Sequence, residues 1–76
     1  HLSNDTAGHF LTELKRLPEH IVLAHLSEHN NLPQLAQDTV QNILQDNNRL
    51  QETELFVAAQ NRVVADSLLP AVLDLK

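Results

Sequence analysis

A short apolar run, His20-Ile21-Val22-Leu23-Ala24, is the feature that most constrains how this chain can fold. The run does not alternate between polar and apolar residues, so it predicts a strand that is buried on both faces rather than on one. It is too short for a buried helix. Because such a strand needs other elements packed over its sheet, the run favours an α/β fold.

Apolar residues recur at helical spacing on both sides of this run. Before it, they follow the N-capping oxygens of Ser3-Asn4-Asp5 and predict a helix from about Asp5 to Leu17, which Pro18 ends. After it, Pro33 predicts the first residue of a second helix, which Asp46-Asn47-Asn48 closes. The apolar positions of the two faces are Ala7, Phe10, Leu11, Leu14 and Leu17, and then Leu35, Ala36, Val40, Ile43 and Leu44.

A second strand is predicted over Leu55–Ala59, between polar stretches on either side. The tail from Val63 to Lys76 is apolar but is interrupted by Asp66 and Pro70, and its pattern assigns no element. Helix, strand, helix and strand in this order indicate a partial βα layer. Two strands buried on both faces require further layers that we expect to lie outside this chain.

Length and composition limit the classes of protein further. A chain of 76 residues buries only roughly 60% of its unfolded surface, and without cysteine it has neither disulfides nor thiolate metal ligands. It begins with His1 and has no methionine, so we expect residues 1–76 to be part of a longer protein and no complete independent domain. The net charge of −5 gives no basic patch for nucleic acid. No apolar run is long enough for a membrane span or a secretion signal, so we expect a cytoplasmic protein without membrane partners.

The most informative of the five histidines is His25, because it directly follows the predicted strand. Side chains at the carboxyl ends of strands carry the chemistry of α/β proteins, and an imidazole there could ligate a divalent metal. The alternative is a loop histidine that bonds a backbone carbonyl. Residues 25–29 also spell H-x-x-E-H, a zinc-peptidase signature that requires a helix. A strand before it and Pro33 after it leave little room for one.

His1 begins a His-Leu-Ser triplet that recurs at His25, each time ahead of a predicted helix. A histidine beside a helix N-terminus could face an anion such as phosphate, and simple helix capping is the alternative. His9 and His20 are expected to be solvated or packed structural residues.

These two segments resemble the C-terminal part of the metallo-β-lactamase-fold metallohydrolases. The residues that carry the similarity are His1-Leu2-Ser3-Asn4 and the segment from Ile21 to Asn31, followed by Pro33, Leu35 and Ala36. The similarity is to the bacterial phosphodiesterase or exonuclease-like branch, which is related to the tRNA 3′-processing ribonuclease Z. It covers about the first 45 residues, and the Leu55–Ala59 strand loosely.

The resemblance implies a four-layered αββα fold and a dinuclear zinc or manganese site. It implies that His25 is a metal ligand and that His1 lies beside the scissile phosphate as a catalytic proton donor or charge stabiliser. Ser3 and Asn4 would fix the turn at His1, and Ser27, Asn30 and Asn31 would at most orient His25.

The chain also departs from the family, because the His-x-His-x-Asp-His motif, the middle histidine and the bridging aspartate are absent from it. We therefore expect the 76 residues alone to be inactive and to bind no metal tightly. The expected parent is a hydrolase that cleaves phosphodiester bonds, with nucleic acid as the expected substrate and the remainder of its own chain as the partner. An oligomer is compatible with the sequence. The alternative is a non-catalytic α/β segment with a structural or protein-interaction role.

Overall fold

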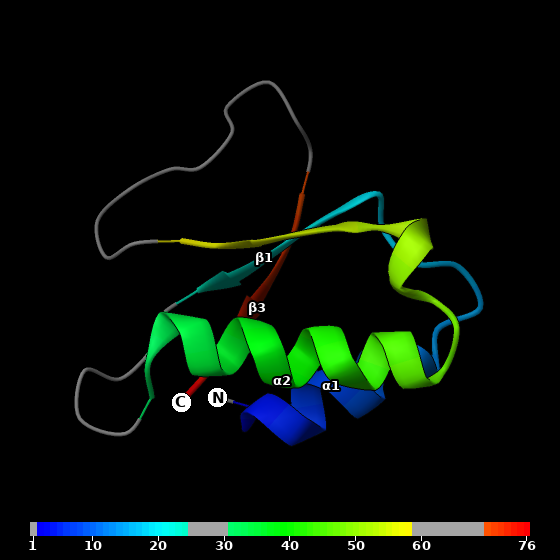
Figure 1. Ribbon diagram of the computed structural model, residues 1–76. Coiled ribbons are helices and arrows are strands. Elements are labelled where there is room, and N and C mark those ends of the chain that lie inside the picture. Colours follow the sequence, from blue (N-terminus) through cyan, green and yellow to red (C-terminus); the bar gives the residue numbers. More distant parts are fainter. Residues whose placement is uncertain (1, 25–30, 59–69) are drawn as a thin grey trace.

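The computed structural model describes residues 2–24, 31–58 and 70–76. Two helices, α1 (Asn4–Thr12) and α2 (Pro33–Asp46), pack against each other and cover one face of a parallel sheet (Figure 1). The sheet contains β1 (His20–Ala24), β2 (Glu54–Val57) and β3 (Ala71–Asp74), and a short 3₁₀ turn at Leu50–Glu52 leads into β2. The chain is therefore a small α/β unit, as the apolar patterns predict.

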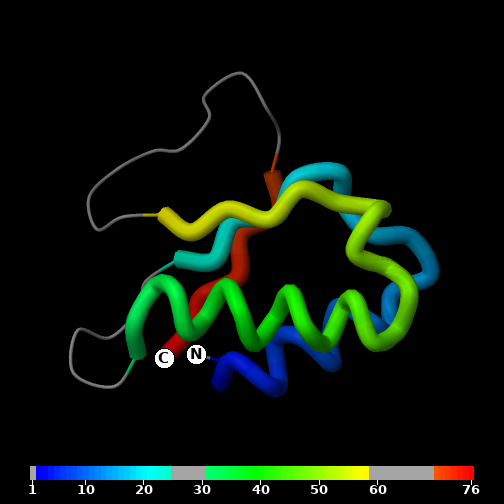
Figure 2. Tube along the Cα trace, in the orientation of Figure 1, coloured from blue at the N-terminus to red at the C-terminus, as the bar shows by residue number. Residues whose placement is uncertain are grey.

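The strand order is β2-β1-β3, with every pairing parallel. Leu2 adds an isolated parallel bridge to Leu75. The Leu75 N–H donates to the Ala24 carbonyl of β1, whereas the Asp74 carbonyl accepts from the Leu2 N–H. The Asp74 carbonyl and the Leu75 N–H belong to the same trans peptide group and point in opposite directions, so Leu2 lies on the side of this segment away from β1. The last strand in sequence therefore lies between β1 and Leu2, and the trace brings the two ends of the chain together (Figure 2).

The central strand β1 is buried along its apolar length, as its lack of alternation predicts. Ile21 and Leu23 face the helices and are fully buried, and Val22 and Ala24, which point the other way, are 5% and 6% exposed. The core of buried residues is Ala7, Leu11, Leu17, Ile21, Leu23, Ala36, Val40, Leu44 and Leu75. Both predicted helical faces therefore contribute to the core, but Phe10 and Leu35, which the sequence pattern places on those faces, are 49% and 53% exposed and lie outside it.

The first helix ends at Thr12, so the predicted extension to Leu17 is wrong. The Glu13 and Leu14 N–H groups bond to the Phe10 and Leu11 carbonyls, which tightens the chain into a turn. Leu17 remains buried although it lies outside the helix. Its apolar position in the pattern therefore reports burial and not helical backbone.

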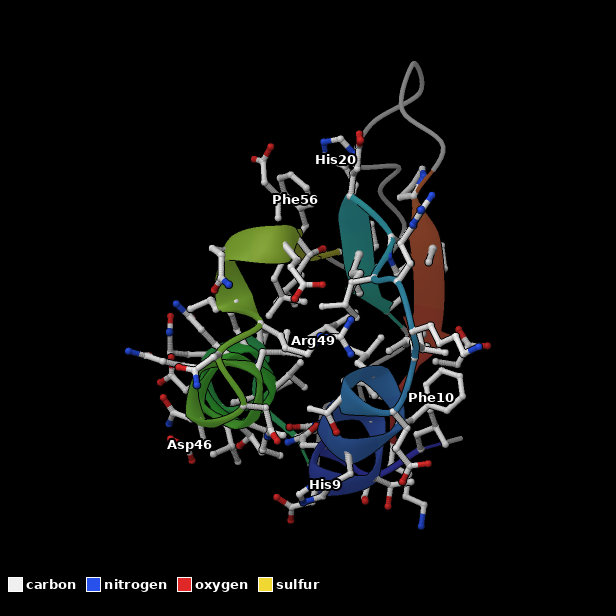
Figure 3. The ribbon with its side chains drawn as sticks, turned by 90° about the vertical axis from the view of Figure 1, so that its right-hand side faces the viewer. His9, Phe10, His20, Asp46, Arg49 and Phe56 are labelled. Atoms are coloured by element: carbon white, nitrogen blue, oxygen red, sulfur yellow. The ribbon has the colours of Figure 1, made fainter. Side chains whose placement is uncertain are left out.

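Arg49 explains how the turn after α1 is held. Its guanidinium donates to the carbonyls of Thr12, Leu14 and Lys15, and it makes two further bonds to the Glu52 carboxylate at 3.0 and 3.1 Å. Figure 3 shows Arg49 between the two helical elements. Its hydrogen bonds to Glu52 raise the pKa of Arg49 and lower the pKa of Glu52. This single side chain therefore joins the end of α1 to the approach to β2.

The second helix begins at Pro33, as predicted, and Asn48, with φ of 58°, follows its C-terminus. The second strand spans Glu54–Val57 and not Leu55–Ala59, and Ala59 lies outside the described residues. β2 lies at one end of the strand order β2-β1-β3, and Leu55, Phe56 and Val57 are only partly buried, which corrects the prediction of a strand buried on both faces. The unassigned tail supplies β3, so the expectation of two strands was also wrong.

Candidate functional site

The carboxyl ends of β1 and β3 meet the start of α1 at one edge of the sheet. There, the Lys76 N–H donates to the Leu2 carbonyl at 2.9 Å, and the Leu75 N–H donates to the Ala24 carbonyl at the same distance. In parallel sheets covered by helices, ligands bind at this carboxyl edge, where loops leave the strands. This edge is therefore the candidate functional site of the chain.

Two asparagines connect the start of α1 with the approach to α2 at this edge. The Asn4 amide donates from Nδ2 to Asn31 Oδ1 at 3.0 Å, and Asn31 Nδ2 donates back to Asn4 Oδ1 at 2.7 Å. Asn31 Nδ2 also donates to the Lys76 carbonyl at 2.9 Å. At 8% exposure, Asn31 is the one buried polar residue among those that the structure describes. The start of α1, the approach to α2 and the end of the chain are thus held by one side-chain network.

Ser3 fixes the other side of this network. Its Oγ accepts the Thr6 N–H at 3.1 Å and donates to Thr6 Oγ1 at 2.8 Å, which makes it the N-cap of α1. An N-cap hydroxyl satisfies one of the free N–H groups of the first helical turn. The sequence offers Ser3, Asn4 and Asp5 as capping residues, and of these Ser3 is the N-cap.

An open depression of about 480 Å³ lies beside the amide network. It is lined by Ser3, Asn4, Asp5, Asn31, Leu35, Thr39 and Lys76. The lining is mixed in chemistry, with one carboxylate, one ammonium group and several neutral hydrogen-bonding groups. Within residues 2–24, 31–58 and 70–76, no three His, Cys, Asp or Glu side chains come close enough together to hold a metal ion. The described part of the chain therefore does not form a metal site by itself.

Three of the seven residues singled out from the sequence lie together at this edge, namely Ser3, Asn4 and Asn31. The other four, His1, His25, Ser27 and Asn30, lie outside the described residues, as does the whole H-x-x-E-H segment. The structure does describe Leu2, which follows His1, and Ala24, which precedes His25. Leu2 and Ala24 both bond to the last three residues of the chain, one on each side.

The remaining histidines lie away from this edge. His9 is exposed on the last turn of α1, and His20 is the first residue of β1, at the opposite end of that strand from Ala24. The His20 ring stacks on Phe56 with centroids 6.1 Å apart, and its Nε2 lies 3.5 Å from Glu54 Oε1 (Figure 3). Neither residue contacts the amide network.

Sequence reasoning missed the contribution of the C-terminal segment to the site. The Lys76 carbonyl accepts a bond from Asn31, and the Lys76 residue also lines the depression. A backbone carbonyl has no signature in the side-chain pattern. The nearest available signal was the Ala71-Val72-Leu73-Asp74-Leu75 stretch, whose strand character would have placed the end of the chain beside β1.

No protein-family profile, curated protein or solved structure matches this chain. Among the helices of the described residues, none has the length and apolar character that a membrane crossing requires.

Proposed function

We propose that this chain is the C-terminal portion of a metallo-β-lactamase-fold hydrolase that cleaves phosphodiester bonds in nucleic acid. The observation that carries the proposal is the reciprocal amide pair between Asn4 and Asn31, which are 27 positions apart. Each asparagine belongs to one of the two segments that resemble this family. Their direct contact supports the interpretation that the two segments are parts of one site.

In this proposal the two histidines have different roles. His25 ligates a metal ion from the loop after β1. His1, next to Leu2 in sequence, protonates the leaving oxygen or offsets the charge that develops on the phosphate. An imidazole suits both roles, because it binds metals when neutral and donates a proton when charged.

The metal ions themselves need ligands beyond this chain. His25 supplies at most one, and the described residues contain no group of three potential ligands. Two divalent ions, zinc or manganese, would polarise the phosphate and lower the pKa of a bound water when the parent protein is complete. Because the chain also lacks a basic patch, phosphate contacts must come from these ions and from the rest of the protein.

The proposal can be tested on the full-length protein that contains this chain, with bis(p-nitrophenyl) phosphate as substrate and bound metal measured by mass spectrometry. We expect His25→Ala to lower the occupancy of one metal. We expect His1→Ala to lower kcat by about 10²- to 10⁴-fold with both metals retained. His9→Ala, the same change at an exposed position on α1, is the matched control and should change neither quantity.

Equal metal content and activity in the His1→Ala and His25→Ala variants would contradict these role assignments. The sequence upstream of His1 gives an independent check. A His-x-His-x-Asp-His motif after a strand is expected there. A full-length protein that has no histidine cluster and does not hydrolyse the diester would instead support the non-catalytic, interaction role.

A further inference from the structure

The two asparagines of the amide network at the carboxyl edge make different numbers of hydrogen bonds. Asn31 uses both hydrogens of its Nδ2, one for Asn4 Oδ1 and one for the Lys76 carbonyl, and its Oδ1 accepts from Asn4. Within the described residues, the Asn4 side chain makes only the two bonds to Asn31. Because the Lys76 carbonyl can only accept, it fixes which end of the Asn31 amide faces it. Asn31 is therefore the donor that the network cannot replace.

Burial increases this inequality. Asn31 is 8% exposed, whereas Asn4 is partly exposed at the rim of the depression. Because Asn31 is buried, water has little access to its side chain and cannot readily replace a hydrogen bond that it loses. Removal of the Asn31 donors would break the part-buried hydrogen bonds to Asn4 Oδ1 and to the Lys76 carbonyl, at the point where the three segments join.

We propose that the Asn4–Asn31 pair is a positioning unit for the site, in which Asn31 holds the start of α1 and the chain end at a fixed spacing from the approach to α2. This inference rests on the proposed function. Neither asparagine needs to touch substrate, because the pair acts through the backbone of the C-terminal segment. In that segment the Lys76 N–H donates to the Leu2 carbonyl and the Leu75 N–H donates to the Ala24 carbonyl. The proposal predicts that turnover depends on the donors of the pair.

The two conservative changes to aspartate separate the donor and acceptor roles. Asn31→Asp removes both donors and places a carboxylate against two acceptor oxygens, so we expect kcat to fall by about 10- to 100-fold, as is typical when groups that orient a metal site are lost. Asn4→Asp keeps an oxygen that can accept the hydrogen bond from Asn31 Nδ2, so kcat should fall by less than about 10-fold. Asn42→Asp, at an exposed position on α2, makes the same change in charge and is the control.

The assay measures kcat and KM for the diester in the full-length protein, together with metal content and circular dichroism. We expect kcat to fall while KM and the fold stay unchanged. A loss of structure alone would not produce this combination. If Asn31→Asp does not fold, Asn4→Ala provides the test, because it removes both bonds of the pair and leaves the Lys76 bond. Its kcat should fall below that of Asn4→Asp.

The possible failures are distinguishable. An unsubstituted protein that does not hydrolyse the diester refutes the proposed function. An active protein in which folded Asn31→Asp matches Asn42→Asp, or in which Asn4→Asp is as damaging as Asn31→Asp, refutes only the positioning role. Equal kcat in Asn4→Ala and Asn4→Asp would overturn it as well.

Discussion

Gly8 lies at the contact between α1 and α2, and its replacement by alanine tests how tightly the two helices pack. A Cβ added at Gly8 would lie 2.6 Å from Ile43 Cδ1, 3.1 Å from Ile43 Cβ and 3.3 Å from Ile43 Cγ2. Rotation of the Ile43 side chain can move Cδ1 away. It cannot move the Ile43 Cβ, so the two helix backbones must separate by a few tenths of an ångström.

Two opposing terms set the size of the effect. Alanine is favoured over glycine inside a helix by about 1 kcal/mol. Overpacking of a close contact costs about 1 to 3 kcal/mol. We therefore expect Gly8→Ala to leave the free energy of unfolding unchanged or to lower it by up to about 2 kcal/mol, and not to show the gain that alanine gives in an open helix.

Urea unfolding followed by far-UV circular dichroism measures this free energy. Ile43→Val removes the Cδ1 atom that is nearest to the added methyl group, and by itself should cost about 0.5 to 1.5 kcal/mol. In that background Gly8→Ala should be less harmful, with a coupling energy of at least about 0.5 kcal/mol between the two sites. A gain of about 1 kcal/mol from Gly8→Ala alone would refute the close packing of the helices, because it is the gain expected from helix propensity without a clash.

The core, the Arg49–Glu52 pair and metal binding each give a further outcome. Leu44→Ala should lower the free energy of unfolding by about 2 to 5 kcal/mol, whereas Leu35→Ala, at a side chain that is 53% exposed, should change it by no more than about 0.5 kcal/mol. Equal costs in the two variants would contradict this assignment of the core. Because Arg49 lowers the folded pKa of Glu52 below 4.5, the pair stabilises the fold above that pH and its contribution is lost as pH falls through the lower value. Glu52→Gln should therefore lose less stability on acidification than the unsubstituted chain in acid-dependent urea titrations, and identical pH profiles would contradict it. Calorimetric titration of the 76-residue chain with zinc or manganese should show no binding of two ions at micromolar affinity, and such binding would argue against a site shared with the rest of the parent.

The elements with strong local signals were predictable from the sequence. The run from His20 to Ala24 forms β1 with its expected bounds, because five apolar or bulky residues without alternation have few other arrangements. Pro33 sets the start of α2 in the same way, since its fixed φ suits the first helical position. The end of α1 was not predictable, because it depends on Arg49, which is 37 residues from Thr12 in sequence.

The candidate site was predictable only in part, and for a related reason. The N-cap role of Ser3 is predictable because serine is preferred at the start of a helix. The arrangement of Asn4 and Asn31 also involves β3, because β3 brings the Lys76 carbonyl to Asn31 Nδ2. The tail that forms β3 is interrupted by polar residues and proline, so its local pattern contains too little information to place the site.

The position of β3 also sets the order in which the chain can fold. Of the elements that the structure describes, this strand comes last in the sequence, and yet it lies between β1 and Leu2, which are made much earlier. Before β3 has been made, α1, β1, α2 and β2 can form contacts with one another. Leu2 and one edge of β1 then still lack the hydrogen-bonding partner that β3 and Leu75 supply. Pairing between strands that are far apart in the sequence slows folding. Until the pairing forms, the open strand edge is prone to aggregate with other chains. During translation, the edge of β1 that pairs with β3 therefore stays open until residues 71–75 have been made.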